Sequence, residues 1–251
     1  MQSGFKAVIF DLDGTAIPNG YMGPPSPVLV QAIRQARRGL VLAAATGRPW
    51  ANCGELLMNM ELSGPAIVAA GSQIVSVGSR EVLWESSLEH GDIAAVLLAC
   101  SRLRNEVLFG EELIGQGGPA ASRVAIESTN VVYVMGCSAD EAARVKSQLA
   151  PAPRLAVTAG PSWTGSSVDL HITRSDATKF HAVTQLQRML GLSVAECIGV
   201  GDGENDLELF RAVAHRVAVE DGARELLEIA DETCPSVERE GFAQYLMSLV
   251  M

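Results

Sequence analysis

The feature that most constrains the fold is an alternation of short apolar strands and amphipathic helices at both ends of the chain. Strands are predicted over Lys6 to Phe10, Leu40 to Ala45 and Ala66 to Ala70, with helices over 26–38 and 50–60 between them. The same alternation resumes near residue 176, with helices over 177–190 and 206–213 and strands over 197–200 and 216–219. Strands joined through helices are parallel neighbours, and helices cover both faces of their sheet.

The middle of the chain has a different texture. Between about residues 79 and 175, two predicted helices (92–104 and 139–149) interrupt the strand-like runs Val82 to Glu85, Val124 to Glu127, Val131 to Met135 and Val168 to Ile172. This pattern favours a mixed or antiparallel sheet. We therefore predict an α/β fold: a Rossmann-like, doubly wound parallel sheet core formed by residues 1–78 and 176–251, with an inserted α+β cap domain formed by residues 79–175.

Composition excludes several classes of partner. The 251 residues are 48% hydrophobic, enough for a substantial core, and 29 acidic against 19 basic residues give a net charge of −10. That balance argues against nucleic acid as a partner. No apolar run approaches 18 residues and no signal peptide is evident, so no membrane association is expected. Five dispersed cysteines without a Cys-x-x-Cys pair predict reduced thiols in a cytoplasmic protein without structural zinc. We expect a monomer or a homodimer.

The strongest local signal is Asp11-Leu12-Asp13-Gly14-Thr15, directly after an apolar strand. Carboxylates at the carboxyl end of a parallel strand lie where open α/β sheets bind their ligands. Gly14 allows a sharp turn, and Thr15 offers a hydroxyl to fix it. A calcium EF-hand loop also has alternating acids, but the frame that begins at Asp11 lacks the Gly at position six and the Glu at position twelve.

A second acidic run, Gly201-Asp202-Gly203-Glu204-Asn205-Asp206, follows the predicted strand 197–200. Acids at the ends of two parallel strands can converge on one hard cation, and carboxylates together with water and phosphate oxygens suit Mg²⁺. A dinucleotide-binding glycine motif is a weak competitor, because its third glycine is missing and Asp202 stands where a pyrophosphate needs backbone amides.

Two further features become candidates for phosphate binding when they are considered together with these acids. Thr46-Gly47-Arg48 closes the second strand and offers a hydroxyl and backbone amides to a phosphate, and Lys179 lies in the first turn of a predicted helix. Taken alone, Thr-Gly is usually a turn and a single lysine usually belongs to a solvated helix face.

In this order, the four features resemble those of the haloacid dehalogenase (HAD) superfamily, and more narrowly its Cof-type phosphatases, whose cap lies between the second and third motifs. The resemblance continues into the C-terminal part, through Val217 to Ala223, Ala230-Asp231 and Glu240-Gly241-Phe242. It covers nearly the whole core, whereas the inserted block matches only in position and size.

The resemblance implies a role for each site residue. Asp11 would be the nucleophile and a Mg²⁺ ligand, and Asp13 would be the general acid and base that also lends its backbone carbonyl to the metal. Thr46 and Lys179 would hold the phosphoryl oxygens, with Gly47 and Arg48 beside them. Asp202 would complete the metal site, to which Asp206 would also belong, and Asn205 and Asp206 would position the phosphate, the metal water or Lys179. A metaphosphate-like transition state spreads negative charge, which a cation and a lysine can neutralise.

The sequence departs from the family pattern at three places: Phe180 follows Lys179 where glycine is common, Ala70 precedes Gly71 where asparagine is frequent, and Ala16 follows Asp-Gly-Thr where leucine is usual. These changes touch no carboxylate, so they bear on substrate fit.

The expected reaction is Mg²⁺-dependent hydrolysis of a small phosphorylated metabolite, with sugar phosphates as one possible class. A phosphomutase and a non-catalytic phosphate-binding protein are the alternatives, and true dehalogenation is disfavoured because Asp13 would have no leaving group to protonate. The four histidines are dispersed, and none is assigned to the site, although His171, in a predicted strand of the inserted block, could face a substrate.

Overall fold

The computed structural model describes residues 4–110, 112–114, 129–162 and 167–250. The elements before the long insertion are β1 (Ala7–Phe10), α1 (Pro27–Ala36), β2 (Val41–Ala44), α2 (Trp50–Asn59), β3 (Pro65–Val68), the 3₁₀ turn η1 (Ala69–Gly71), β4 (Gln73–Ser76) and β5 (Val82–Glu85). The insertion contains α3 (His90–Cys100), β6 (Val107–Phe109), β7 (Glu112–Ile114), β8 (Val132–Cys137), α4 (Ala139–Leu149), β9 (Leu155–Pro161) and β10 (Val168–Arg174). The remaining elements are α5 (Lys179–Leu190), η3 (Val194–Glu196), β11 (Cys197–Gly201), η4 (Glu204–Asp206), α6 (Leu207–Arg211), β12 (His215–Val219), α7 (Arg224–Ile229), β13 (Glu232–Cys234), η5 (Val237–Arg239) and α8 (Gly241–Val250).

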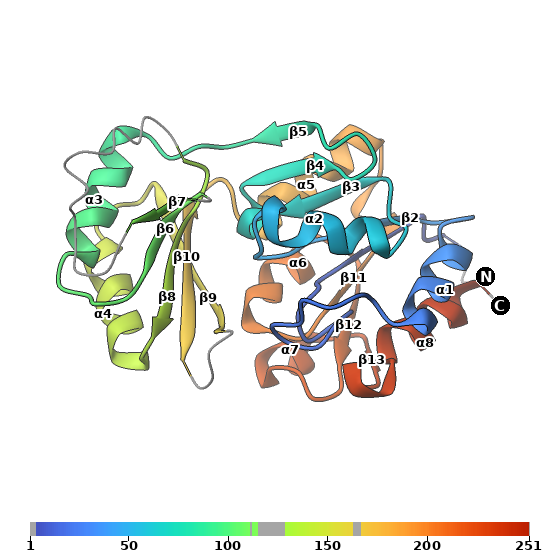
Figure 1. Cartoon of the computed structure of the whole chain (residues 1–251). Helices are drawn as coiled ribbons and strands as arrows, with labels where there is room; N and C mark the ends of the chain where they lie inside the picture. The colour runs from blue at the N-terminus through green and yellow to red at the C-terminus, as the bar shows by residue number, and fades with distance from the viewer. Residues whose placement is uncertain (1–3, 111, 115–128, 163–166, 251) are drawn as a thin grey trace.

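A five-stranded parallel sheet forms the centre of the larger lobe in Figure 1, in the order β13-β12-β11-β1-β2. Strand β1 lies between β11 and β2 in parallel register, with Phe10 opposite Val200 on one side and Ala44 on the other. This pairing joins the first and last parts of the chain and brings the ends of β1 and β11 to one edge. The predicted Rossmann-like sheet is confirmed.

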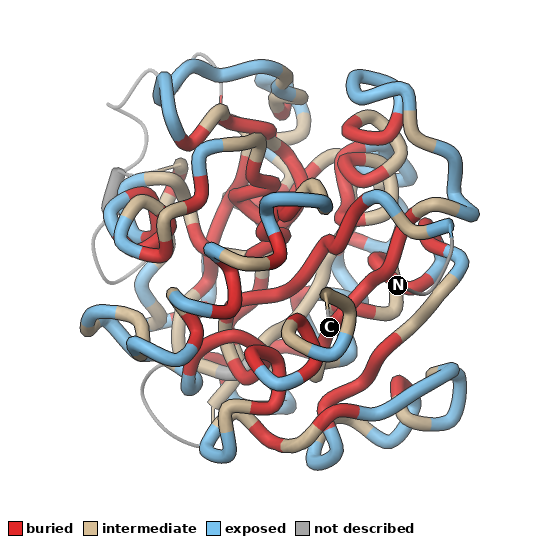
Figure 2. The backbone as a smooth tube through the Cα atoms, turned by 90° about the vertical axis from the view of Figure 1, so that its right-hand side faces the viewer, coloured by how far each residue is buried: buried red, intermediate tan, exposed pale blue. Residues whose placement is uncertain are grey.

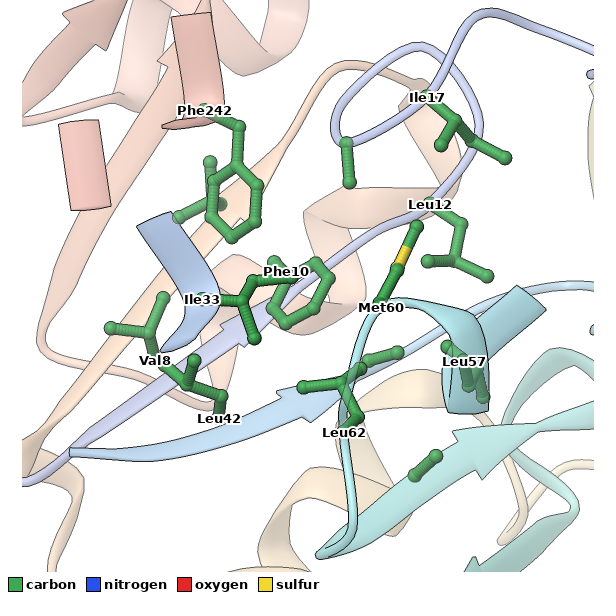
Figure 3. Packing of buried hydrophobic residues seen from close by; sticks show 14 of the residues in the cluster. Val8, Phe10, Leu12, Ile17, Ile33, Leu42, Leu57, Met60, Leu62 and Phe242 are labelled. Atoms are coloured by element: carbon green, nitrogen blue, oxygen red, sulfur yellow. The ribbon is translucent and has the colours of Figure 1, made fainter. Parts of the chain in front are cut away.

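Helices cover both faces of this sheet because β1 is apolar on both. Val8 and Phe10 belong to a core with α1 and α8, whereas Ala7 and Ile9 pack with residues of α5 and α6. Phe10 and Phe242 of α8 stack with ring centroids 4.5 Å apart (Figure 3). The central strands are accordingly buried along their length, as Figure 2 shows.

The third predicted strand does not extend the parallel sheet as a full ladder. Strand β3 makes one parallel bridge beside the end of β2, Ala45 with Ile67, and otherwise pairs antiparallel with β4. Strand β5, which the sequence analysis placed in the inserted block, pairs antiparallel with β4 in the same three-stranded sheet. The chain therefore crosses to the second lobe after Glu85.

The second lobe contains a five-stranded antiparallel sheet in the order β7-β6-β8-β10-β9, here called the inserted sheet. Val132 and Val134 of β8, with Leu170 and Ile172 of β10, are buried in a core that includes α3 and α4. Both helices therefore lie on one face of this sheet, on the side away from the parallel sheet in Figure 1.

Two predicted helices are closely matched: α4 covers 139–149 as predicted, with Ser138 and Glu141 forming its capping box, and α1 has Ser26 as its N-cap. Strands β4, β6, β7, β9 and β13 were not predicted, and the predicted strand Val124 to Glu127 lies outside the described residues.

Gly71 shows how the fold fixes the start of α5. Its φ of +100° suits glycine, and a Cβ there would lie 2.4 Å from the backbone carbon of Thr178. We predict that Gly71→Ala lowers the free energy of unfolding by about 2 kcal/mol or more, because both strain and overlap oppose it. Urea denaturation measures the effect. The matched control is Gly39→Ala, since nothing lies within 4 Å of a Cβ there. Equal unfolding free energies for the two variants would contradict the prediction.

Candidate active site

Three carboxylates meet at the carboxyl edge of the parallel sheet. Asp11 follows β1, and its backbone N–H continues the ladder by donating to the carbonyl of Val200 at 2.9 Å. Asp202 follows β11, and Asp206 ends the short turn η4. Each of the three offers an oxygen, and the three oxygens lie within 4.8 Å of one another. The predicted convergence of acids from two strand ends is therefore present.

The ammonium of Lys179 lies between two of these acids. Its Nζ donates to Asp11 Oδ1 at 2.7 Å and to Asp206 Oδ1 at 2.6 Å. All three side chains are at most 5% exposed. The bland alternative for Lys179, a solvated lysine on a helix surface, is thus wrong: the first residue of α5 points into the site.

The loops that follow β1 and β11 pack closely together and are joined by hydrogen bonds. Thr15 Oγ1 donates to Asp202 Oδ1 at 2.7 Å, and Asp206 Oδ2 accepts from the backbone N–H groups of Asp202 and Gly203, each at 3.1 Å. Gly14 has a φ of +81°, and a Cβ at this position would overlap the Asp202 carboxylate. The Gly-Thr pair after Asp13 therefore lets the two acidic loops approach closely.

Asp13 lies apart from the three-acid cluster and is paired with Arg48. The guanidinium donates from Nε to Asp13 Oδ2 at 2.7 Å and from Nη2 to Oδ1 at 2.5 Å. The N–H of Gly20 also donates to Oδ1, at 3.1 Å. This two-pronged ion pair fixes the carboxylate plane of Asp13.

The other predicted residues surround a cavity of about 370 Å³. Thr46 is buried, with its Oγ1 accepting the N–H of Arg48 at 3.1 Å, whereas Gly47 and Asn205 line the cavity. The structure thus gathers every predicted site residue at this edge of the sheet.

His171, which was named from the sequence as a residue that could face a substrate, lines this cavity. The other cavity residues that the insertion supplies were missed, namely Leu108, Gly110, Tyr133, Met135, Gly160, Ser162 and Asp169. The Tyr133 hydroxyl donates to the carbonyl of Gly47 at 3.0 Å, and a Cβ at Gly47 would lie 2.6 Å from His171 Cε1. A usable signal existed: in β10, polar Asp169, His171 and Thr173 alternate with apolar neighbours, which predicts one polar face.

Burial and mutual repulsion dominate the electrostatics. Burial, followed by the charge of Asp206, raises the pKa of Asp11 well above its ordinary value, and the same two causes raise the pKa of Asp202 to about 7. Burial opposes the charge of Lys179, yet Asp11 and Asp206 hold its pKa above the ordinary value. For His171, burial and then the charge of Lys179 lower the pKa to about 4, so its imidazole is neutral near pH 7.

The donor set suits a divalent metal ion. When ionised, Asp11, Asp202 and Asp206 carry three negative charges, and Lys179, which contacts Asp11 and Asp206, balances only one of them, so an excess of negative charge would remain at a largely buried site. Such an excess is costly unless a cation neutralises it. Carboxylate oxygens are ligands for hard cations such as Mg²⁺, Mn²⁺ or Ca²⁺.

Comparisons with known proteins identify the family of this chain. The family model of haloacid dehalogenase-like hydrolases matches residues 8–114 and 126–246. The chain belongs to this family. It is a phosphatase of the Cof type, as the resemblance in the motifs indicated.

Individual relatives cover different shares of the chain. The phosphoglycolate phosphatase of Methanopyrus kandleri is 26% identical over 97% of this chain and 96% of its own length. That of Archaeoglobus fulgidus is 37% identical, but over 32% of this chain and 35% of its own length. A solved HAD subclass IIB sugar phosphatase superposes with a TM-score of 0.78, at 19% identity over 97% of this chain and 98% of that structure. No helix in the described part of the chain is both long and apolar enough to span a membrane.

We predict that metal binding and proton release are linked through Asp202. Because a metal ligand must be deprotonated, a divalent cation would compete with a proton at a carboxyl whose pKa is about 7. The affinity for such a cation, measured with Mg²⁺, should therefore rise between pH 5.5 and 8, by roughly tenfold per pH unit below 7 for each displaced proton. Calorimetry in two buffers with different ionisation enthalpies counts the protons released.

In the metal-free protein, the free energy of unfolding should change with pH in the opposite direction to the metal affinity. Between about pH 4 and 7 the folded chain holds a proton that the unfolded chain releases, so the free energy of unfolding should fall as pH rises. Asp202→Asn should flatten this slope. Glu204→Gln is the matched control, since Glu204 is an exposed acid of the same turn. A pH-independent Mg²⁺ affinity without proton release would contradict the assignment.

Proposed function

We propose that this chain hydrolyses small phosphate monoesters with Mg²⁺, through a phosphoryl intermediate on Asp11. One observation carries the proposal: Lys179 holds Asp11 Oδ1 and Asp206 Oδ1 beside Asp202 at the wall of a cavity. Asp11 Oδ2 has no hydrogen bond from any described residue, so one oxygen of this carboxylate is oriented while the other stays available as a nucleophile.

In the first step, Asp11 Oδ2 forms a bond to phosphorus as the bond between phosphorus and the ester oxygen breaks, and Asp13 gives a proton to the departing alkoxide. In the second step, water attacks the phosphorus of the aspartyl-phosphate and Asp13 takes its proton. Phosphate leaves, and the carboxylate of Asp11 and the proton on Asp13 are restored.

The remaining site residues would neutralise the charge of the phosphoryl group or hold the metal ion. Lys179 and Thr46 would contact phosphoryl oxygens, where negative charge is spread in the transition state. Asp11, Asp202 and Asp206, with the backbone carbonyl of Asp13, would hold Mg²⁺. When bound, this ion neutralises phosphoryl charge and allows the anionic ester to approach the acids.

Arg48 holds the carboxylate of Asp13 in one orientation. Its guanidinium donates from Nε to Asp13 Oδ2 and from Nη2 to Asp13 Oδ1. For the first step Asp13 must carry a proton, so this ion pair must loosen when a substrate is bound. Arg48 is thus a positioning residue for Asp13, and Asn205 and Gly47 border the space for the phosphoryl group.

We also propose that the inserted lobe acts as a cap over the cavity. Tyr133 contacts the Thr46-Gly47-Arg48 loop, and the walls of the cavity come from both lobes. Such closure excludes water and places the leaving group against the inserted sheet. The proposed division remains core 1–78 and 176–251 with cap 79–175, and the pairing of β5 with β4 favours a first crossing after Glu85.

The reaction itself is tested with an aryl phosphate. We predict that the purified full chain releases phosphate and phenol in equal amounts with Mg²⁺, and that chelation reduces turnover at least a hundredfold until Mg²⁺ is restored. Equal release also separates hydrolysis from a phosphomutase, which passes the phosphoryl group to a second hydroxyl. Undiminished turnover after thorough metal removal would refute the metal assignment.

Substitutions of Asp11 and Asp13, the two acids of the first loop, should have different effects. Asp11→Asn should abolish phosphoenzyme formation, because an amide is a poor nucleophile. Asp13→Asn should keep the first step with an aryl ester, whose phenolate leaves without protonation, but lose the base for the second. Rapid-quench kinetics should then show a burst of phenol and slow turnover, and mass analysis should find phosphate on Asp11. Equal loss in both variants, without burst or adduct, would count against this division of labour.

A further inference from the structure

The face of the inserted sheet that α3 and α4 leave uncovered forms one wall of the cavity. Along β8, Tyr133 and Met135 alternate with the valines that pack under those helices, and Leu108 has the same position on β6. Along β10, the alternate residues on this side are Asp169 and His171. This wall is therefore mostly apolar, with one carboxylate in its described part.

Asp169 is held in place with one oxygen left over. The side chain is 3% exposed, and its Oδ1 accepts the backbone N–H of Gly136 at 2.6 Å. Its Oδ2 has no hydrogen-bond partner among the residues that the structure describes. This oxygen is not fully enclosed by protein, because among the described residues Tyr245 Oη is the one fully enclosed side-chain polar atom that lacks a partner. Because Asp169 lines the cavity, Oδ2 is an acceptor open to it.

No compensating cation is found on this side of the cavity in the described residues. Arg48 lines the cavity but is bound to Asp13, and Lys179 is bound to Asp11 and Asp206. His171 is neutral near pH 7, since burial and the charge of Lys179 lower its pKa. A carboxylate on a bound molecule would thus face Asp169 without a counter-charge, whereas a hydroxyl or ammonium group would find an acceptor.

We propose that Asp169 selects phosphate esters whose leaving group carries a hydrogen-bond donor, a hydroxyl or an ammonium, and excludes those that carry a carboxylate. This inference rests on the proposed function, since it assigns the phosphoryl group to the end of the cavity near Asp11. The apolar side chains of Leu108, Tyr133 and Met135 would contact the carbon chain between the two ends.

The test uses three matched series of substrates. With Mg²⁺ and the full chain, kcat/KM is measured for ω-hydroxyalkyl, ω-aminoalkyl and ω-carboxyalkyl phosphates of two to four carbons, so that chain length brings the terminal group to Asp169. We expect at least one hydroxyalkyl or aminoalkyl ester to exceed the carboxyalkyl ester of equal length by tenfold or more. The difference between the hydroxyl and ammonium series tells which donor is preferred.

The decisive variant is Asp169→Asn, because the amide oxygen can still accept from Gly136 while the charge is lost. It should raise kcat/KM for the carboxyalkyl ester and lower it for the aminoalkyl ester, each about tenfold and mainly through KM. Asp140→Asn is the control: Asp140 is an exposed acid in the first turn of α4, and its loss changes the net charge equally. Its selectivity should equal that of the wild type.

Binding separates the two proposals. Calorimetry with the corresponding non-hydrolysable phosphonates ranks the three terminal groups without turnover. If no ester is hydrolysed but hydroxyl or ammonium phosphonates bind tenfold more tightly than carboxylates, the proposed reaction fails and the selection by Asp169 stands. If wild type and Asp169→Asn show the same ranking, or the wild type prefers carboxylates, the selection is refuted whatever the reaction.

Discussion

The contact on which the structure depends is the buried ammonium of Lys179 between Asp11 and Asp206. These residues come from the start of α5, the end of β1 and the turn after β11, so one lysine joins three segments at a single point. Removing it would leave three neighbouring carboxylates without a counter-charge in a buried place, which is strongly unfavourable. The same excess of negative charge would favour a bound cation, so the stability of the fold and the proposed chemistry depend on one set of charges.

This arrangement also explains why the chain can carry a long insertion. The chain leaves the core after β5 and returns just before Lys179, whose backbone is packed against Gly71. The return point is thus fixed by contacts inside the core. The insertion can then place its open sheet face over the site without altering the distances between the acids. One of its polar contacts with the Thr46-Gly47-Arg48 loop, the hydrogen bond from the Tyr133 hydroxyl to the carbonyl of Gly47, is made to backbone and involves no side chain of the acidic cluster.

The sequence predicted the parallel sheet and the acidic edge because both depend on local patterns. Short runs buried on both faces identify β1 and β11, and each is followed at once by acidic and glycine residues that mark a functional loop. The burial of Lys179 could not be read locally, since it depends on where α5 lands. The pairing of β5 with β4 was missed for a similar reason, because it is set by a hairpin register that an exposed, weakly alternating segment does not specify.

The two ends of the cavity are therefore formed by residues that are spaced differently along the sequence. The proposed phosphoryl end is built from contiguous motifs at strand ends, so it could be recognised in the sequence. The opposite end is built from every second residue of β8 and β10, where the choice between Asp169 and another side chain is unconstrained by the helices packed behind. Substitutions there can change the leaving group that fits while leaving the fold and the attack on phosphorus intact. For this reason the named activities of relatives at 26% identity or less do not fix the substrate of this chain, and the side chains on the open face of the inserted sheet carry that information.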